Sequence, residues 1–159
     1  MHPSVARVVA AAHGAGLAIE VRRFPEGTRT AADAARAVGC EVAQIVKSLV
    51  FFADEVPVIA LLSGLDRLDP ARLAAVLGAG RVRRADGDEV RIATGFAIGG
   101  VPPIGHARAL TVLIDEHLLV HDEVWAAAGL PDAVFRVAPG ALQHAAGARS
   151  AALAVTASD

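Results

Sequence analysis

The chain has 159 residues, of which 54% are hydrophobic and 20% are charged. This length and composition predict one folded domain with a full core and exclude wholesale disorder, and the lack of an apolar run of about 18 residues excludes a membrane-spanning helix. The formal net charge of −2 excludes a protein that holds nucleic acid by bulk positive charge alone, and the single cysteine excludes a disulfide framework or a cysteine-based zinc site.

The first part of the chain carries signals for two helices and a strand. Apolar residues recur at helical spacing in residues 3–14, which lack the long apolar stretch of a secretory signal, and residues 17–24 alternate as a strand does. Thr30 has the position of an N-cap for a second helix, with Asp33 three residues later and Gly39 as its stop.

The middle of the chain predicts a β-hairpin. Residues 45–52 (IVKSLVFF) and 56–63 (VPVIALLS) are both strand-like, and the turn between them is short enough for the two strands to pair. Three further signals follow: a helix over 70–77, a short strand over 81–84, and a capping box at Asp86 and Glu89 that precedes a short helix.

The last third begins with the loop 94–106, TGFAIGGVPPIGH, which holds four glycines and two prolines. Strands are predicted over 110–115 and 133–137, a helix begins at Pro139, and 151–155 adds an edge strand. No sustained β-α-β alternation is present, which excludes a doubly wound parallel sheet. The sequence predicts an α/β (α+β) domain spanning residues 1–159, with a mixed, mainly antiparallel sheet surrounded by helices.

Lys47 is the only lysine among 15 basic residues, and the other fourteen are arginine. A site that needs a compact ammonium cannot accept the planar guanidinium in its place. Lys47 lies within the apolar segment 45–52, where the alternation of a strand puts it on one face with Leu49 and Phe51. Because lysine is rarely buried unless it is paired or functional, Lys47 is the candidate catalytic residue. The alternative is a lysine at the end of a strand that extends into solvent.

The loop GGVPPIGH is the second candidate. Its glycines allow the backbone to approach a ligand, its prolines stiffen the turn, and free amides there can hold a carbonyl or an oxyanion. The loop is neither a GxGxxG motif nor a P-loop, so no nucleotide fingerprint applies. His106 closes the loop and could assist a proton transfer, whereas the alternatives are a plain tight turn and a solvated histidine.

Other side chains give weaker signals. His117 and His121 have the i, i+4 spacing of a zinc-binding pair but lack the inner glutamate of HExxH, so a solvated charged segment is the favoured interpretation. Ser63 lacks the GxSxG context of a nucleophile and is interpreted as a pocket-lining hydroxyl. Cys40 is interpreted as a structural thiol and Trp125 as a core residue. Two arginine clusters could contact phosphates, although a solvated surface is the default: Arg22, Arg23 and Arg29, and Arg81, Arg83, Arg84 and Arg91.

These motifs together resemble the YbaK/ProX family of single-domain aminoacyl-tRNA deacylases, which is related to the editing domain inserted in bacterial prolyl-tRNA synthetases. The matching segments occur in unbroken order between Phe24 and Ala148: TAADAARAVGC at 30–40, QIVKSLVF at 44–51, LLSG at 61–64, TGFAIGGVPPIGH at 94–106, ID at 114–115 and VWAAAG at 124–129. The pairing of QIVKSL with GGVPPIGH at this separation is the specific part of the resemblance.

The resemblance implies a sheet of barrel-like curvature and a site that takes a tRNA 3′ end carrying a wrongly attached amino acid. Lys47 matches the essential lysine of the family, and Gly99 to Pro103 match its GxxxP loop. The expected substrate-binding residues are Thr30, Phe51, Ser63, Gly99, Gly100, Val101, Pro102, Pro103, Gly105 and His106. No cofactor and no metal are expected, and the expected location is cytoplasmic.

The function that follows is hydrolysis of the ester of a mischarged tRNA, of the Cys-tRNA(Pro) type or with a related small amino acid such as Ala, Ser or Thr. Water, or a hydroxyl or thiol of the substrate, would attack the ester, and an aminoacyl-tRNA synthetase is a possible partner. The alternative is a non-catalytic module that captures an aminoacyl group or a tRNA end for a synthetase, which predicts binding without turnover.

Overall fold

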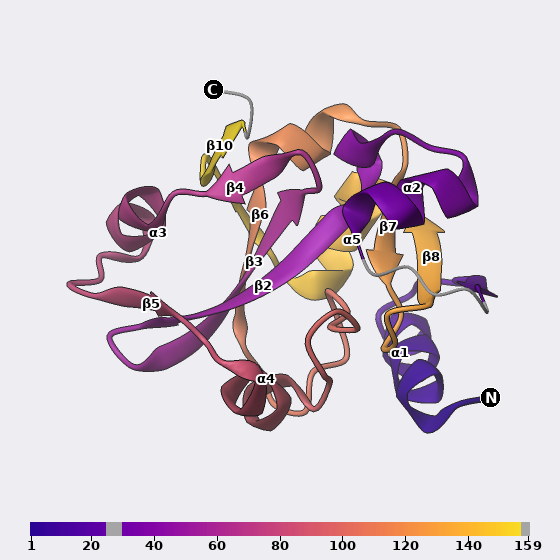
Figure 1. Ribbon diagram of the computed structural model, residues 1–159. Helices are drawn as coiled ribbons and strands as arrows, with labels where there is room; N and C mark the ends of the chain where they lie inside the picture. The colour runs from indigo at the N-terminus through magenta and orange to yellow at the C-terminus, as the bar shows by residue number, and fades with distance from the viewer. Residues whose placement is uncertain (25–29, 157–159) are drawn as a thin grey trace.

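The computed structural model describes residues 1–24 and 30–156. A long β-hairpin forms its centre, in which β2 (Val46–Ala53) pairs antiparallel with β3 (Val56–Ser63). The turn between them places Asp54 and Glu55 at positive φ. The predicted hairpin is confirmed, and it sets the frame on which the remaining strands are arranged (Figure 1).

The hairpin belongs to a five-stranded mixed sheet of order β5-β2-β3-β6-β9. β5 (Val82–Arg84) pairs antiparallel with β2, while β6 (Thr111–Asp115) runs parallel to both β3 and β9 (Arg149–Ala151). A second sheet has the order β1-β8-β7, with β1 (Val21–Arg23), β7 (Val124–Ala127) and β8 (Ala133–Val137) all antiparallel, and β4 (Asp66–Leu68) forms a third sheet with β10 (Ala154–Thr156).

Five α-helices surround the sheets: α1 (Pro3–Gly14), α2 (Ala31–Val38), α3 (Pro70–Leu77), α4 (Gly87–Thr94) and α5 (Pro139–Ala146). Two short 3-10 helices, η1 (Val42–Gln44) and η2 (Glu116–Val120), complete the described elements. The predicted caps are confirmed, because the Thr30 hydroxyl accepts from the Asp33 amide at 3.0 Å and Asp86 forms its capping box with Glu89. No helix in the described ranges is long and apolar enough to cross a membrane.

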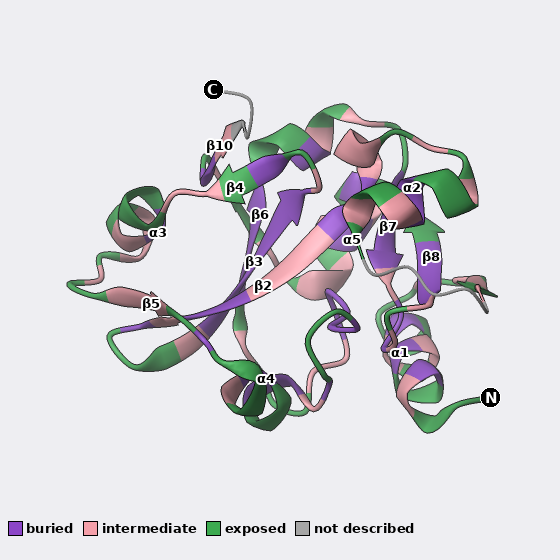
Figure 2. Cartoon of the chain, viewed as in Figure 1, coloured by how far each residue is buried: buried purple, intermediate pink, exposed green. Residues whose placement is uncertain are grey.

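Strand β2 is partly buried and partly half-buried along its length (Figure 2), and its two faces pack into different parts of the core. Val46 and Val50 belong to the largest cluster of buried side chains, which includes α1 and the loop after α4. Phe51 belongs to a second cluster with Leu73 and Leu113. The alternation predicted for this strand is therefore confirmed, and it separates Lys47 from Ser48.

The predicted fold class is confirmed, with corrections to several elements. Of the strand predicted over 17–24, only Val21–Arg23 pairs, because only these residues have partners on β8. The segment 151–155 divides between β9 and β10, which join different sheets. Strands β4 and β7 were not predicted. The sheets do not close into a barrel in the described part of the chain, since the five-stranded sheet meets β7 only through a bridge between Ile45 and Trp125.

Candidate functional site

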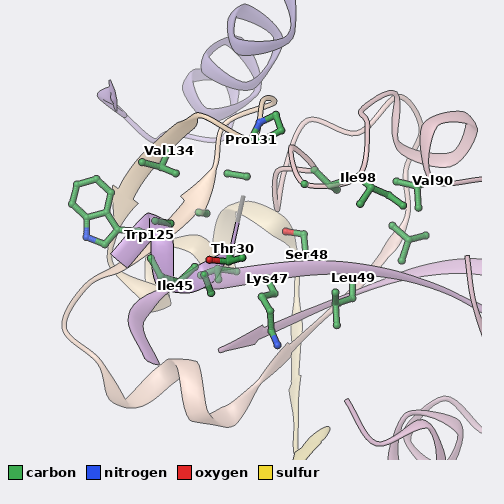
Figure 3. A pocket seen from close by; sticks show the side chains of 18 of the residues that line it. Thr30, Ile45, Lys47, Ser48, Leu49, Val90, Ile98, Trp125, Pro131 and Val134 are labelled. Carbon is green, nitrogen blue, oxygen red and sulfur yellow. The ribbon is translucent and has the colours of Figure 1, made fainter. Parts of the chain in front are cut away.

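A cavity of about 350 Å³ lies beside β2, on the side of its Ser48 face. Strand β2, the start of α2, the loop after α4, and strands β7 and β8 form its walls, which are mostly small or branched apolar side chains (Figure 3). The volume is at the lower end of the ~300–1,000 Å³ that is usual for small-molecule sites. The cavity therefore suits a small group rather than an extended ligand.

Lys47 contributes to the lining of this cavity, but its amine is turned away from it. Figure 3 shows the side chain directed to the opposite side of β2 from Ser48, and its Nζ donates to the main-chain oxygen of Asp66. Burial lowers the pKa of this half-buried amine, the charge of Asp66 raises it, and the charge of Arg84 lowers it further. The amine therefore does not face the glycine–proline loop across the cavity, so the structure does not bring the two main candidates from the sequence together.

Lys47 nevertheless differs from a structural ion-pair lysine. No carboxylate lies within 4.0 Å of its Nζ in the described residues, and its acceptor is a neutral carbonyl. A half-buried ammonium with no carboxylate in direct contact attracts an anion more strongly than one held in an ion pair does. Its role in catalysis stays a prediction.

The glycine–proline loop, GGVPPIGH at residues 99–106, contributes Gly99 and Val101 to the cavity, and Ile98 just before it also lines the cavity. Gly99 is exposed and has a φ of +91°, which favours glycine. The Gly100 amide donates to the oxygen of Ala97 at 3.0 Å, so it is not the free donor that the sequence suggested. Pro102 and Pro103, in the middle of the loop, are buried and do not line the cavity.

The other predicted loop residues hold the loop in place. Gly105 has a φ of +81° and lies against α1, where an added Cβ would be 3.0 Å from that of Ala11. The His106 Nε2 lies 2.7 Å from the Pro102 oxygen, and burial lowers the pKa of this imidazole, against the opposing effect of that hydrogen bond. Neither residue lines the cavity.

Two predicted substrate-binding residues lie elsewhere, and a third lies at the edge of the cavity. Phe51 packs in the core on the far face of β2. The Ser63 hydroxyl donates to the Ala43 oxygen at 2.8 Å and accepts from the Leu65 amide, so it holds the end of β3 in place. Thr30 is exposed and does line the cavity, although its hydroxyl is also the N-cap of α2.

Three lining residues were not selected from the sequence as part of a site. Trp125 is buried as expected, but it also forms one end of the cavity, with the Arg22 guanidinium 5.0 Å from its ring centroid. Arg84 is an exposed cation in the lining. Ser48 has the one buried side-chain oxygen that lacks a hydrogen-bond partner among the described residues. Only tertiary contacts distinguish these residues from other arginines, serines and core tryptophans.

Two further arginines of the predicted clusters form ion pairs with carboxylates. Arg23 pairs with Asp132 at 3.3 Å, and Arg83 pairs with Glu55 at 2.9 Å and with Glu89 at 2.8 Å. Arg29 lies outside the described residues.

Cys40 is half-buried, and burial together with the charge of Glu41 raises the pKa of its thiol, which suits a structural role rather than a nucleophile.

His117 does not form a pair with His121. Its Nδ1 lies 2.6 Å from a carboxylate oxygen of Asp66, and its own amide donates to Asp115, whose other oxygen accepts from the amides of Leu153 and Ala154. The ligand atoms of Asp66, Asp115 and His117 lie within 4.8 Å of one another. Because these atoms are already engaged in a closed hydrogen-bond network, we interpret the cluster as a structural link between β4, β6 and η2.

We expect the contribution of His117 to stability to depend on pH. The hydrogen bond to Asp66, followed by the charges of Asp115 and Glu116, raises the pKa of His117 above its usual value, against the effect of desolvation. A raised folded-state pKa means that the stabilisation is complete below a pH of about 6.5 and is lost as the pH rises through the higher folded-state pKa. His117→Asn should therefore lower the free energy of unfolding more at pH 6 than at pH 9, as measured by urea denaturation. His144→Asn, at an exposed position of α5, serves as the control, and an equal cost of His117→Asn at both pH values would contradict the prediction.

The comparisons with known proteins agree with this architecture. The sequence model of the aminoacyl-tRNA editing domain matches residues 25–145, which include every residue that lines the cavity. A solved chain described as a "putative trans-editing enzyme for prolyl tRNA synthetase" superposes with a TM-score of 0.93 at 46% identity, and the superposition covers 98% of this chain and 99% of the other.

Curated relatives are much longer proteins. The proline–tRNA ligase of Limosilactobacillus fermentum is 34% identical over 102 residues, which are 61% of this chain and 18% of the ligase, and that of Lactobacillus gasseri is 40% identical over 73 residues, 46% of this chain and 13% of the ligase. The matched part of this chain thus spans less than a fifth of either ligase. The family match extends over the hairpin, the glycine–proline loop and all the residues that line the cavity. On this evidence the chain belongs to the aminoacyl-tRNA editing domain family.

Proposed function

We propose that this protein is a trans-editing aminoacyl-tRNA deacylase, which hydrolyses the ester between a wrongly attached small amino acid and the terminal ribose of a tRNA. The observation that carries the proposal is the cavity of about 350 Å³ within the segment that matches the family. Its size suits an aminoacyl group. The similarity to a structure described as a trans-editing enzyme supports the same conclusion.

The reaction that the site would perform is ester hydrolysis by water. Water adds to the carbonyl carbon, the bond from that carbon to the ribose oxygen breaks, and the ribose oxygen takes a proton. Negative charge develops on the carbonyl oxygen during the addition, so the site needs positive potential or N–H donors close to it. Lys47 is proposed to supply this potential after its side chain turns from the Asp66 oxygen toward the cavity, and Gly99 lies at the rim where the ester would be held.

The rim of the cavity has features that suit the 3′ end of a tRNA. Arg84 lines the cavity, and Arg22 and Arg136 both lie over the ring of Trp125, with distances to the centroid of 5.0 and 5.9 Å. Guanidinium groups at this position can contact phosphates. The formal net charge of −2 indicates that affinity for tRNA would come from such local contacts. A cytoplasmic location and cooperation with a synthetase are part of this proposal.

A non-catalytic binding module is the second candidate, and a specific observation favours it. The Lys47 amine is turned from the cavity and the Gly100 amide is occupied, so two donors expected for catalysis are engaged elsewhere in this structure. This candidate predicts saturable binding of aminoacyl-tRNA without turnover.

Deacylation of a panel of mischarged tRNAs distinguishes the two functions. We expect the protein to release the amino acid from at least one tRNA carrying Cys, Ala, Ser or Thr, at a rate well above spontaneous hydrolysis. Release is measured from the loss of labelled aminoacyl-tRNA in a quench assay, with correctly charged Pro-tRNA(Pro) as the control. Binding to these tRNAs without faster release from any of them would contradict the deacylase and support the binding module.

A further inference from the structure

The hydroxyl of Ser48 is a polar atom in an apolar wall. Its oxygen is buried and has no hydrogen-bond partner among the described residues, and Figure 3 shows it pointing from β2 into the cavity. The neighbouring positions of the same face, Val46 and Val50, are buried and apolar. A buried hydroxyl without a protein partner is costly to leave unpaired, so it indicates a position where a ligand or water completes the hydrogen bonding.

We propose that Ser48 determines the specificity of this site by binding the side-chain hydroxyl of the aminoacyl group, so that the preferred substrates carry serine or threonine. The inference rests on the proposed function, because it assumes that an aminoacyl group enters this cavity. It adds a chemical class of substrate to a site whose size alone would also admit alanine or cysteine.

The location of Ser48 makes the side chain of the substrate its partner. The lining residues Thr30, Ile98 and Gly99 are exposed and mark the mouth of the cavity, whereas the Ser48 oxygen is buried within it. An amino acid attached to a tRNA enters such a cavity with its side chain first, because its carboxyl carbon is tied through the ester to the ribose of a polymer that stays outside. The ester then stays near Gly99 at the mouth, and the side chain reaches the depth of Ser48.

The chemistry of the walls selects a neutral, small and hydrogen-bonding group. Ala34, Ile45, Val134 and the other buried lining residues offer no charge, so an acidic or basic side chain would lose its hydration without a partner. A hydroxyl can both donate to and accept from the Ser48 oxygen, whereas a methyl group cannot and a thiol does so weakly. Alanine would leave the Ser48 hydroxyl unpaired, which lowers its affinity relative to serine.

No other hydroxyl in the lining competes for this role. The Thr30 hydroxyl is the second one there, but it accepts from the Asp33 amide at the exposed start of α2. Ser63 lies outside the cavity and is bound to the Ala43 oxygen. Ser48 therefore has the side-chain hydroxyl in the described lining that makes no hydrogen bond to the protein.

The test measures kcat/KM for one tRNA charged with serine or with alanine. The wild type should prefer the seryl ester, and Ser48→Ala should lower the ratio of seryl to alanyl kcat/KM by about tenfold, which corresponds to one neutral hydrogen bond. Ser150→Ala, which removes an exposed hydroxyl on β9, is the matched control and should leave the ratio unchanged. Thermal unfolding should show no loss of Tm in Ser48→Ala, because its hydroxyl has no partner in the described residues.

A binding measurement separates this inference from the proposed function. Adenosine with serine or alanine in a 3′-amide linkage cannot be hydrolysed as an ester, and its Kd is measured by calorimetry for the wild type and Ser48→Ala. A seryl preference that Ser48→Ala removes supports the inference even if no ester is hydrolysed, in which case the deacylase alone fails. The inference is overturned if the wild type binds both analogues with equal affinity, or if Ser48→Ala weakens the binding of both by the same factor. In that case, hydrolysis of alanyl-tRNA would still support the proposed deacylase function.

Discussion

Replacing Lys47 with alanine is expected to lower kcat/KM for deacylation by about 100- to 1,000-fold, the usual effect of removing one electrostatic donor from an active site. The ammonium is half-buried and desolvation lowers its pKa, and it has no carboxylate partner within 4.0 Å among the described residues. Its hydrogen bond to the Asp66 oxygen is the contact that must break when the amine turns toward a bound ester. The measurement is a steady-state assay on the mischarged tRNA that the wild type hydrolyses fastest.

Two further variants distinguish the effect of the Lys47 amine from that of positive charge in general. Arg67→Ala removes one exposed cation from β4, next to Asp66, and should keep kcat/KM within about twofold of the wild type. Lys47→Arg keeps the charge but replaces a compact ammonium with a planar guanidinium, and we expect its kcat/KM to fall by at least about tenfold. Activity of Lys47→Ala equal to that of the wild type on every tRNA tested would remove Lys47 from the mechanism.

The direction of the Lys47 side chain shows where prediction from sequence stops. The strand and its two faces followed from alternation, and the structure confirms both, with Phe51 and Ser48 on opposite sides. The acceptor of the Lys47 amine lies on β4, a three-residue strand that pairs with β10, more than 80 residues later in the chain. A strand so short has no periodicity to detect, so neither the strand nor its contact with Lys47 could be predicted.

The glycine–proline loop and the cavity wall show the same limit of prediction from sequence. The composition of the loop predicted a tight backbone near a ligand, and Gly99 does line the cavity. Which amide of the loop is free depends on the turn in which the Gly100 amide donates to Ala97. Which loop residues reach the cavity depends on how the loop packs against the connection between β7 and β8. A serine within a strand is common in sequences, and only the folded structure shows that the Ser48 oxygen has no partner among the described residues.

Gly100→Ala is expected to destabilise the protein by about 1–3 kcal/mol and to remove deacylation. An added Cβ at this position would lie 2.9 Å from the Gly129 oxygen and 2.9 Å from the Leu130 Cα, which are backbone atoms that cannot rotate away. The turn at Gly129 cannot retreat either, because a Cβ there would meet the Ser4 oxygen of α1 at 2.6 Å. The loop itself must move, and this movement displaces Gly99 from the cavity.

The measurement is urea denaturation combined with the deacylation assay, and Gly140→Ala is the matched control. Gly140 is an exposed residue in the first turn of α5, and a Cβ added there has no neighbour within 4 Å, so alanine should be neutral or slightly stabilising. The loss of activity in Gly100→Ala should exceed the fraction of unfolded protein, since the displaced loop alters the cavity of the folded molecules. A Gly100→Ala protein as stable and as active as Gly140→Ala would show that the loop does not need this close contact, and that its position does not shape the site.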